Sequence, residues 1–209
     1  MINTLARIFG SKTHAQEIVL LQKDVKHVVR HGFYESEISQ VEHYCRENNL
    51  FCVRSKFKVI LADDTGYSNK GFRVPENDSR QGMYFLYMSK DEEKVWLAAY
   101  YELMNNHVDL GLLLGYPRCC VNFFCRNFSE NNPNPAHIPT NPFTNLTKRN
   151  NDAVLVSHFP CSSDCEESIA LAKVYLAVLM KEDTGRTEEL LKELRLTQSQ
   201  SQQDNDPIP

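Results

Sequence analysis

Five of the chain's seven cysteines lie in two short segments, residues 115–125 and 158–168. The first reads Gly-Tyr-Pro-Arg-Cys-Cys-Val-Asn-Phe-Phe-Cys, and the second reads His-Phe-Pro-Cys-Ser-Ser-Asp-Cys-Glu-Glu-Ser. Four cysteine thiolates are a common donor set for a tetrahedral zinc ion or an iron–sulfur cluster. We therefore predict one shared metal site formed by Cys119, Cys120, Cys161 and Cys165.

Both segments have the sequence of a helix start. Pro117 suits the first helical position, where its missing amide costs nothing, and this places Cys119 and Cys120 at the third and fourth positions. Ser163 and the glutamate three residues later have capping-box spacing, which makes Ser163 the N-cap and Cys165 the second helical residue. Free amides and the positive dipole end favour thiolates at a helix start. Because neighbouring thiolates repel, a bound cation is expected to hold four of them together.

The spacing of the cysteines bears on which metal binds. A zinc ribbon usually has two Cys-x-x-Cys pairs. Here an adjacent pair is followed, after 161 − 120 = 41 residues, by Cys-x-x-x-Cys. Adjacent side chains on a helix point about 100° apart, and a cluster with several irons accommodates that divergence better than one small ion. The spacing therefore favours an iron–sulfur cluster, with zinc as the alternative.

Three functions remain open at this stage. The first is an iron–sulfur protein that serves a small-molecule reaction or electron transfer. The second is a cofactor-free thiol enzyme, in which Cys119 or Cys161 is the nucleophile and His158 is its base. The third is a binding module with a structural zinc site. An incidental structural role for the four cysteines is the remaining alternative, and Cys125 is expected in the core.

The two segments also resemble the signature blocks of a known family. Tyr-Pro-x-Cys-Cys at 116–120 and His-x-Pro-Cys-x-x-x-Cys at 158–165 look like the motifs of an uncharacterised prokaryotic family, a domain of unknown function. The resemblance covers about Leu110 to Ala172. It implies no activity, and it implies that the family's motif positions here are Cys119, Cys120, His158, Cys161 and Cys165.

Composition limits the class of protein. The 209 residues are 42% hydrophobic and 24% charged, which predicts one domain with a substantial core. The net charge is −4 and no Lys/Arg block occurs, so no nucleic-acid partner is indicated. No run of 18 apolar residues predicts a membrane span, and the first ten residues are too polar for a secretory signal. We expect a cytoplasmic protein with reduced or metal-bound cysteines and a small-molecule substrate as the partner to consider; the oligomeric state is not indicated.

Hydrophobic periodicity predicts the elements that carry the site. Together they indicate an α+β fold: a small antiparallel sheet flanked by five or six helices, in a single domain over residues 1–196. A stripe of Trp96, Ala99, Tyr100 and Leu103 is expected in the core. Strands are expected at 51–61, 72–74, 83–88 and 153–156, and helices at 13–28, 35–48, 89–103, 109–114, after each cysteine segment and at 187–196.

Two segments lack such periodicity. Residues 129–151 are crowded with Asn and Pro and lie between the cysteine segments, so they are predicted to form an irregular loop that could act as a lid over the site. Residues 197–209 are rich in Ser, Gln and Asp and are expected to be a disordered tail.

Overall fold

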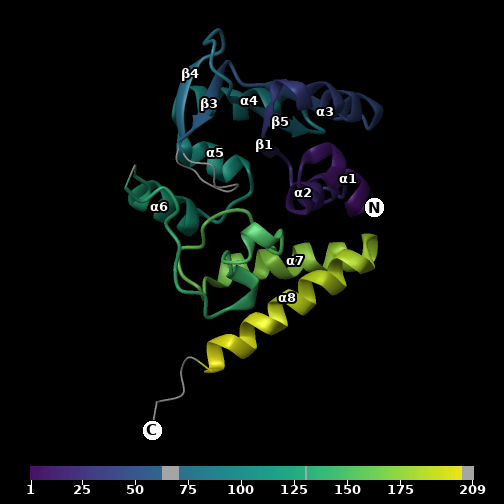
Figure 1. Ribbon diagram of the computed structural model, residues 1–209, viewed down its shortest axis with the longest axis vertical. Helices are drawn as coiled ribbons and strands as arrows, with labels where there is room; N and C mark the ends of the chain where they lie inside the picture. Colours follow the sequence, from purple (N-terminus) through teal and green to yellow (C-terminus); the bar gives the residue numbers. More distant parts are fainter. Residues whose placement is uncertain (63–70, 130, 204–209) are drawn as a thin grey trace.

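The computed structural model describes residues 1–62, 71–129 and 131–203, with side chains up to residue 194. It confirms the α+β class: one antiparallel sheet of five strands is surrounded by helices (Figure 1). The described residues contain eight α-helices, more than the five or six expected. The helices are α1 (Ile2–Phe9), α2 (Lys12–Gln22), α3 (Glu35–Glu47), α4 (Glu92–Leu103), α5 (His107–Leu113), α6 (Arg118–Asn127), α7 (Glu166–Glu182) and α8 (Thr184–Gln203).

Strand β5 is the centre of the sheet. It pairs with β1 along one edge and with β2 and β3 along the other, and β4 pairs with β3. All of these pairings are antiparallel. The strands are β1 (Val29–Tyr34), β2 (Phe51–Arg54), β3 (Phe57–Leu61), β4 (Gly71–Pro75) and β5 (Met83–Ser89).

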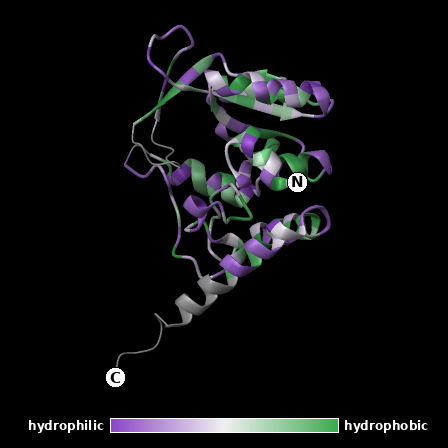
Figure 2. Cartoon of the chain, turned by 45° about the vertical axis from the view of Figure 1, so that its right-hand side comes forward, coloured by the Kyte–Doolittle hydropathy of each residue, from purple (hydrophilic) through white to green (hydrophobic). Residues whose placement is uncertain are grey.

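Both faces of the central strand β5 are covered. Alternate residues of β5 divide between two cores: Leu86 and Met88 pack with α1–α3, α7 and α8, and Tyr87 packs with α4 and α5. The hydrophobic residues of the N-terminal helices appear in green in Figure 2. Since side chains alternate between faces along a strand, a strand covered on both faces is apolar throughout.

The strand predicted over residues 51–61 is divided at Ser55. There the Ser55 hydroxyl accepts a hydrogen bond from the Phe85 amide (3.1 Å), and the Ser55 amide donates to the Phe85 carbonyl (2.8 Å). Four residues separate Arg54 from Val59, whereas two separate their partners Leu86 and Met83 on β5. The segment 51–61 therefore contains two extra residues before pairing resumes at Val59. The other two predicted strands of the sheet, near 72–74 and 83–88, are observed as β4 and β5.

The helix predicted over residues 13–28 is wrong in its second half. Ser11 is the observed N-cap of α2, with its hydroxyl accepting from the His14 amide (3.0 Å). Asp24 has a φ of 60° after the helix ends, and the chain then enters β1. The apolar residues near 25–28 fit both the helical period of 3.6 residues and the strand period of two. The left-handed backbone of Asp24 follows the end of the helix and directs the chain into the strand.

The apolar stripe expected to bury α4 instead faces outward. Trp96 and Tyr100 are each 55% exposed, and Leu103 is 49% exposed. The buried face of α4 consists of Val95, Ala98 and Glu102, and the N-cap is Asp91. Glu102 is buried because Arg30 forms a bidentate ion pair with it (2.5 Å) and the Tyr87 hydroxyl donates to it (2.7 Å).

The C-terminal half surrounds the cysteine segments. Two 3-10 turns, Pro142–Thr144 and Arg149–Asn151, interrupt the irregular 129–151 segment. Residues 153–156 are buried as expected, but they form no strand; the Val154 carbonyl accepts from Gln16 Nε2 (2.8 Å) instead of a strand partner. Helix α8 begins at Thr184, not at the expected cap Thr187, and continues to Gln203, past the expected end at Leu196. Of the predicted disordered tail, residues 204–209 lie outside the described residues.

Candidate metal centre

The first cysteine pair lies in the first turn of α6. Helix α5 is followed by Gly115, whose φ of 80° turns the chain, and Pro117 is the N-cap of α6 rather than its first residue. Cys119 and Cys120 are therefore the second and third helical residues, one position earlier than predicted. Gly111 sets α5 close to α6, since a Cβ there would lie 2.8 Å from Val121 Cγ2.

The second pair lies on the loop that enters α7. Cys165 is the N-cap, so the predicted capping box with Ser163 as N-cap is wrong. The Ser163 hydroxyl is occupied by the 129–151 segment: it accepts from the backbone amides of Thr140 (2.7 Å) and Asn141 (3.0 Å). Because Cys165 is only one residue before the helix, it still lies at the helix start, as the chemistry of the site requires.

The four predicted sulfur atoms converge. Cys119 Sγ lies 3.8 Å from Cys120 Sγ and 3.7 Å from Cys165 Sγ, and Cys120 Sγ lies 3.6 Å from Cys165 Sγ. With Cys161 included, all four sulfurs lie within 4.8 Å of one another. Cys120 and Cys165 are buried, and the other two are partly exposed. The group can hold a metal ion, and the predicted convergence of two helix starts is confirmed.

The thiols differ in how readily they ionise. Burial, reinforced by the thiols of Cys165 and Cys161, raises the pKa of Cys119 to about 12. Burial likewise raises the pKa of Cys120. Burial also opposes ionisation of Cys165, but hydrogen bonds from the hydroxyl and backbone amide of Ser168, together with the thiols of Cys120 and Cys161, outweigh it and lower the pKa of Cys165 to about 7. In the metal-free protein the pocket therefore stabilises one thiolate readily and opposes further negative charge, which a bound cation would compensate.

A chain of hydrogen bonds leads from Cys120 into the core. Ser168 Oγ lies 3.1 Å from Cys120 Sγ and 2.8 Å from His158 Nε2, and the Cys161 amide donates to Cys120 Sγ (3.3 Å). A thiolate only accepts, so with Cys120 ionised the Ser168 hydroxyl donates to it and His158 Nε2–H donates to Ser168. Burial, with a smaller contribution from Lys26, lowers the pKa of His158 to about 3, so this histidine is neutral at pH 7.

His158 therefore reaches the site through Ser168. Its predicted partners as a general base were Cys119 and Cys161; its hydrogen bond leads to Cys120 instead. Its ring also lies over Tyr116, with centroids 5.2 Å apart. This geometry is that of a group that orients and supports a ligand.

Next to His158 is a second buried polar group. Ser157 Oγ donates to Glu17 Oε1 (2.8 Å), and the same oxygen accepts from Lys26 Nζ at 2.5 Å. Burial alone would raise the pKa of Glu17, but Lys26 outweighs it and the pKa is lowered; Glu17 in turn raises the pKa of Lys26 against its own burial. This ion pair keeps both charges at neutral pH.

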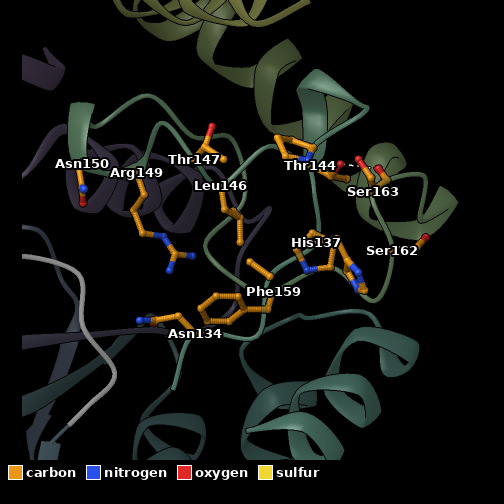
Figure 3. Close-up of a pocket in the computed structure, with 13 residues that line it drawn as sticks. Asn134, His137, Thr144, Leu146, Thr147, Arg149, Asn150, Phe159, Ser162 and Ser163 are labelled. Atoms are coloured by element: carbon orange, nitrogen blue, oxygen red, sulfur yellow. Dashed lines mark hydrogen bonds between the residues drawn. The ribbon is translucent and has the colours of Figure 1, made fainter. Parts of the chain in front are cut away.

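The 129–151 segment is fastened to the second cysteine loop and reaches α6. Besides the two amides bound by Ser163, Thr144 Oγ1 donates to the Ser163 carbonyl (2.5 Å), and the His137 ring contacts that of Phe123 in α6 in a tilted arrangement, with centroids 4.7 Å apart. Together they enclose a surface pocket of about 260 Å³ beside Cys161 (Figure 3). In Figure 3 the Arg149 side chain extends towards Phe159, whose ring is 4.9 Å from the guanidinium carbon. The segment is thus packed against the second cysteine loop and α6, and its role as a lid stays a prediction.

Sequence reasoning missed Ser168, Ser157 and Glu17. Ser168 had a usable signal, because it follows Cys165 by three residues and so shares its helix face. Ser157 and Glu17 had none, since their contact joins residues 140 apart in the sequence.

The remaining cysteines lie outside the group. Cys45 is buried in the core. Cys52 is half-buried beside it. Cys125 is exposed, so the expectation of a core position is wrong.

Comparison with known proteins shows that this region is similar to an uncharacterised family. Residues 95–195, which include both cysteine segments, match the model of a family described as a protein of unknown function (DUF483). The resemblance to a family without assigned activity is thereby confirmed. No curated protein and no solved structure matches the chain. In the described part of the chain, none of the helices is long and apolar enough to cross a membrane.

Proposed function

We propose that the protein is a metal protein whose four cysteines hold one tetrahedral zinc ion. The observation that supports this choice is the sulfur spacing. Zinc–sulfur bonds of about 2.3 Å in a tetrahedral site place neighbouring sulfurs about 3.8 Å apart. Three of the sulfur pairs lie at 3.6–3.8 Å, and the whole group lies within 4.8 Å.

The same spacing weakens the reason for preferring an iron–sulfur cluster. That preference assumed that adjacent cysteines diverge too far for one small ion. Cys119 and Cys120 nevertheless bring their sulfurs within 3.8 Å of each other. A cluster distributes its four cysteines over several irons and needs them further apart. The iron–sulfur protein therefore remains the second candidate, with the thiol enzyme behind it.

The donor set also indicates what the ion would do. Four thiolates leave no open coordination position, which is typical of structural zinc. A bound zinc ion would join the start of α6 to the start of α7. Its positive charge would compensate the negative charge of the thiolates, which the pocket otherwise opposes. Ser168 and the Cys161 amide would support Cys120 as a ligand.

Metal analysis after anaerobic purification without chelator tests the proposal. We expect about one zinc per chain and no absorption band in the visible range. Cys119→Ser should lose the metal, whereas Cys125→Ser, at a cysteine outside the group, should keep it. Iron with acid-labile sulfide and visible absorption would establish the cluster instead. A chain with neither metal, and with one cysteine alkylated much faster than the others at neutral pH, would support the thiol enzyme.

A further inference from the structure

A second, larger cavity lies behind the cysteine site. It has a volume of about 410 Å³, within the usual range for small-molecule sites. Strands β1, β3, β4 and β5 form one side, and α5, α6 and residues 157–159 form the other. Cys120 and His158 belong to its wall, so the cavity meets the proposed metal site.

The opposite end of the cavity is positively charged. Arg30, Arg73 and Glu102 line it, which gives 2 − 1 = +1. Burial, with Arg73 next in effect, lowers the pKa of the adjoining His107, so this ring adds no positive charge at pH 7. Neither guanidinium is fully engaged by Glu102. A guanidinium has five N–H donors, and Glu102 takes two from Arg30 and, at its backbone carbonyl, one from Arg73. The Glu102 carboxylate also forms an ion pair with Arg73 Nη2 at 3.6 Å.

Between the two ends the wall is apolar and aromatic. Phe85 lies under the Arg30 guanidinium, 3.6 Å from ring centroid to guanidinium carbon. Phe124 and Phe159 stack at 5.6 Å on the helical side. The cavity is therefore polarised: cationic at the sheet, apolar in the middle, and bounded by thiols at α6.

The structure assigns this cavity to a small organic monoanion, a carboxylate with an apolar or aromatic body. The carboxylate would lie at Arg30 and Arg73, which offer the planar N–H pairs that carboxylates accept. The body would lie between Phe85 and Phe124 and extend towards Cys120. Arg30 and Arg73 lie at the sheet end of the cavity, and their position fixes this orientation. The proposed metal site forms one wall of the ligand site, and only this wall depends on the proposed function.

Calorimetric titration of the metal-loaded full chain with phenylbutyrate and with its uncharged amide, phenylbutyramide, tests the assignment. We expect the acid to bind about tenfold more tightly than the amide, since the charged hydrogen bonds are made only by the acid. Arg73→Gln should remove this preference and leave amide binding unchanged. Arg80→Gln, at a guanidinium paired with Asp78 and outside the cavity lining, is the matched control and should retain the preference.

A second pair of variants tests the location. Cys125 lines the cavity and is exposed, so Cys125→Trp should fill the opening and weaken both probes at least tenfold, while Cys125→Ser should not. Equal binding of acid and amide, binding unaffected by Arg73→Gln, or no saturable binding of either probe would overturn the assignment.

Zinc measured on the same samples separates the two proposals. Acid-selective binding that depends on Arg73 in a chain without metal would refute the metal site and leave the ligand site standing. Stoichiometric zinc without acid-selective binding would refute the ligand site and leave the metal site standing.

Discussion

The cysteine group and the Glu17–Lys26 pair are both buried, and they differ in how their charge is balanced. Glu17 and Lys26 are opposite charges 2.5 Å apart, and each shifts the other's pKa towards the charged form. The four thiols can each become only neutral or negative, and the pKa values of Cys119 and Cys120 are raised, which disfavours their charged forms. The ion pair is complete within the protein. Among the described residues, the partners of the cysteine sulfurs are other thiols, the Ser168 hydroxyl and a backbone amide, and none of these is a cation.

This difference indicates which site depends on something from outside. A compensated pair contributes to the fold as soon as the chain closes, and removing either partner leaves a buried charge. A group of like acceptors becomes stabilising when a cation binds. The two sites should therefore respond in opposite ways to mutation of the protein and to removal of metal.

The largest effect is expected at the ion pair. Glu17→Gln leaves Lys26 buried without a counter-charge and should lower the free energy of unfolding by about 3–5 kcal/mol, measured by urea titration. Metal content should not change. Replacing both residues by Met should recover most of the loss, because no charge is then left unpaired. A loss of zinc in Glu17→Gln would show that the two sites are not separable.

Metal removal should have the next largest effect. If free zinc is kept at 100 times its dissociation constant, binding stabilises the folded state by about 2.7 kcal/mol. For a chain of this length, that corresponds to a Tm change of roughly 5–11 °C. Chelation should therefore lower the Tm of the wild type and of Glu17→Gln by the same amount. Cys120→Ser should show no response to the chelator, and an equal response there would count against the four-cysteine site.

Acid should destabilise the protein through His31. Burial, then His14, Lys26 and Arg30, lower the pKa of His31 well below 6.5, so the unfolded chain binds a proton that the folded chain does not. Stability from this residue is present above pH 6.5 and is lost as pH falls below that value, by about 1.4 kcal/mol per pH unit. Unfolding titrations of metal-loaded wild type and His31→Gln between pH 6.5 and 5 should differ by this slope. Protonation linked to the metal site contributes equally to both variants and cancels in the difference. Parallel slopes would show that His31 is not the group responsible.

The smallest effect is expected at the hydrogen-bond support of the metal site. Ser168→Ala removes the hydroxyl between Cys120 and His158, and loss of such support should weaken zinc binding about tenfold. Competition with a chromogenic chelator measures this change. Ser162→Ala is the matched control, since Ser162 is exposed and contributes only its carbonyl to the adjacent turn. Equal zinc affinities in the two variants would show that the Ser168 hydroxyl does not support zinc binding.

The convergence of the cysteines could be predicted from the sequence because the relevant signals are local. Pro117 and the polar residues near 163 mark helix starts, and the cysteines at both starts favour a shared thiolate site. The details failed where a distant partner competes for the same atom. Ser163 matches a capping box, but amides of the 129–151 segment occupy its hydroxyl.

Burial on α4 could not be predicted for a related reason. Trp96 and Tyr100 form the more hydrophobic stripe, yet the helix buries the side that carries Glu102. That choice depends on Arg30 from β1, which is 72 residues away in the sequence. Periodicity detects a stripe, whereas the partner that decides its direction lies elsewhere in the chain.

The separation of the two cysteine segments has a consequence for synthesis. Cys119 leaves the ribosome 165 − 119 = 46 residues before Cys165. At about 5–20 residues per second, the first two thiols wait for roughly 2–9 seconds before their partners exist. During that interval they are exposed to oxidants and to any passing metal, so the nascent chain is more vulnerable at this site than the finished protein.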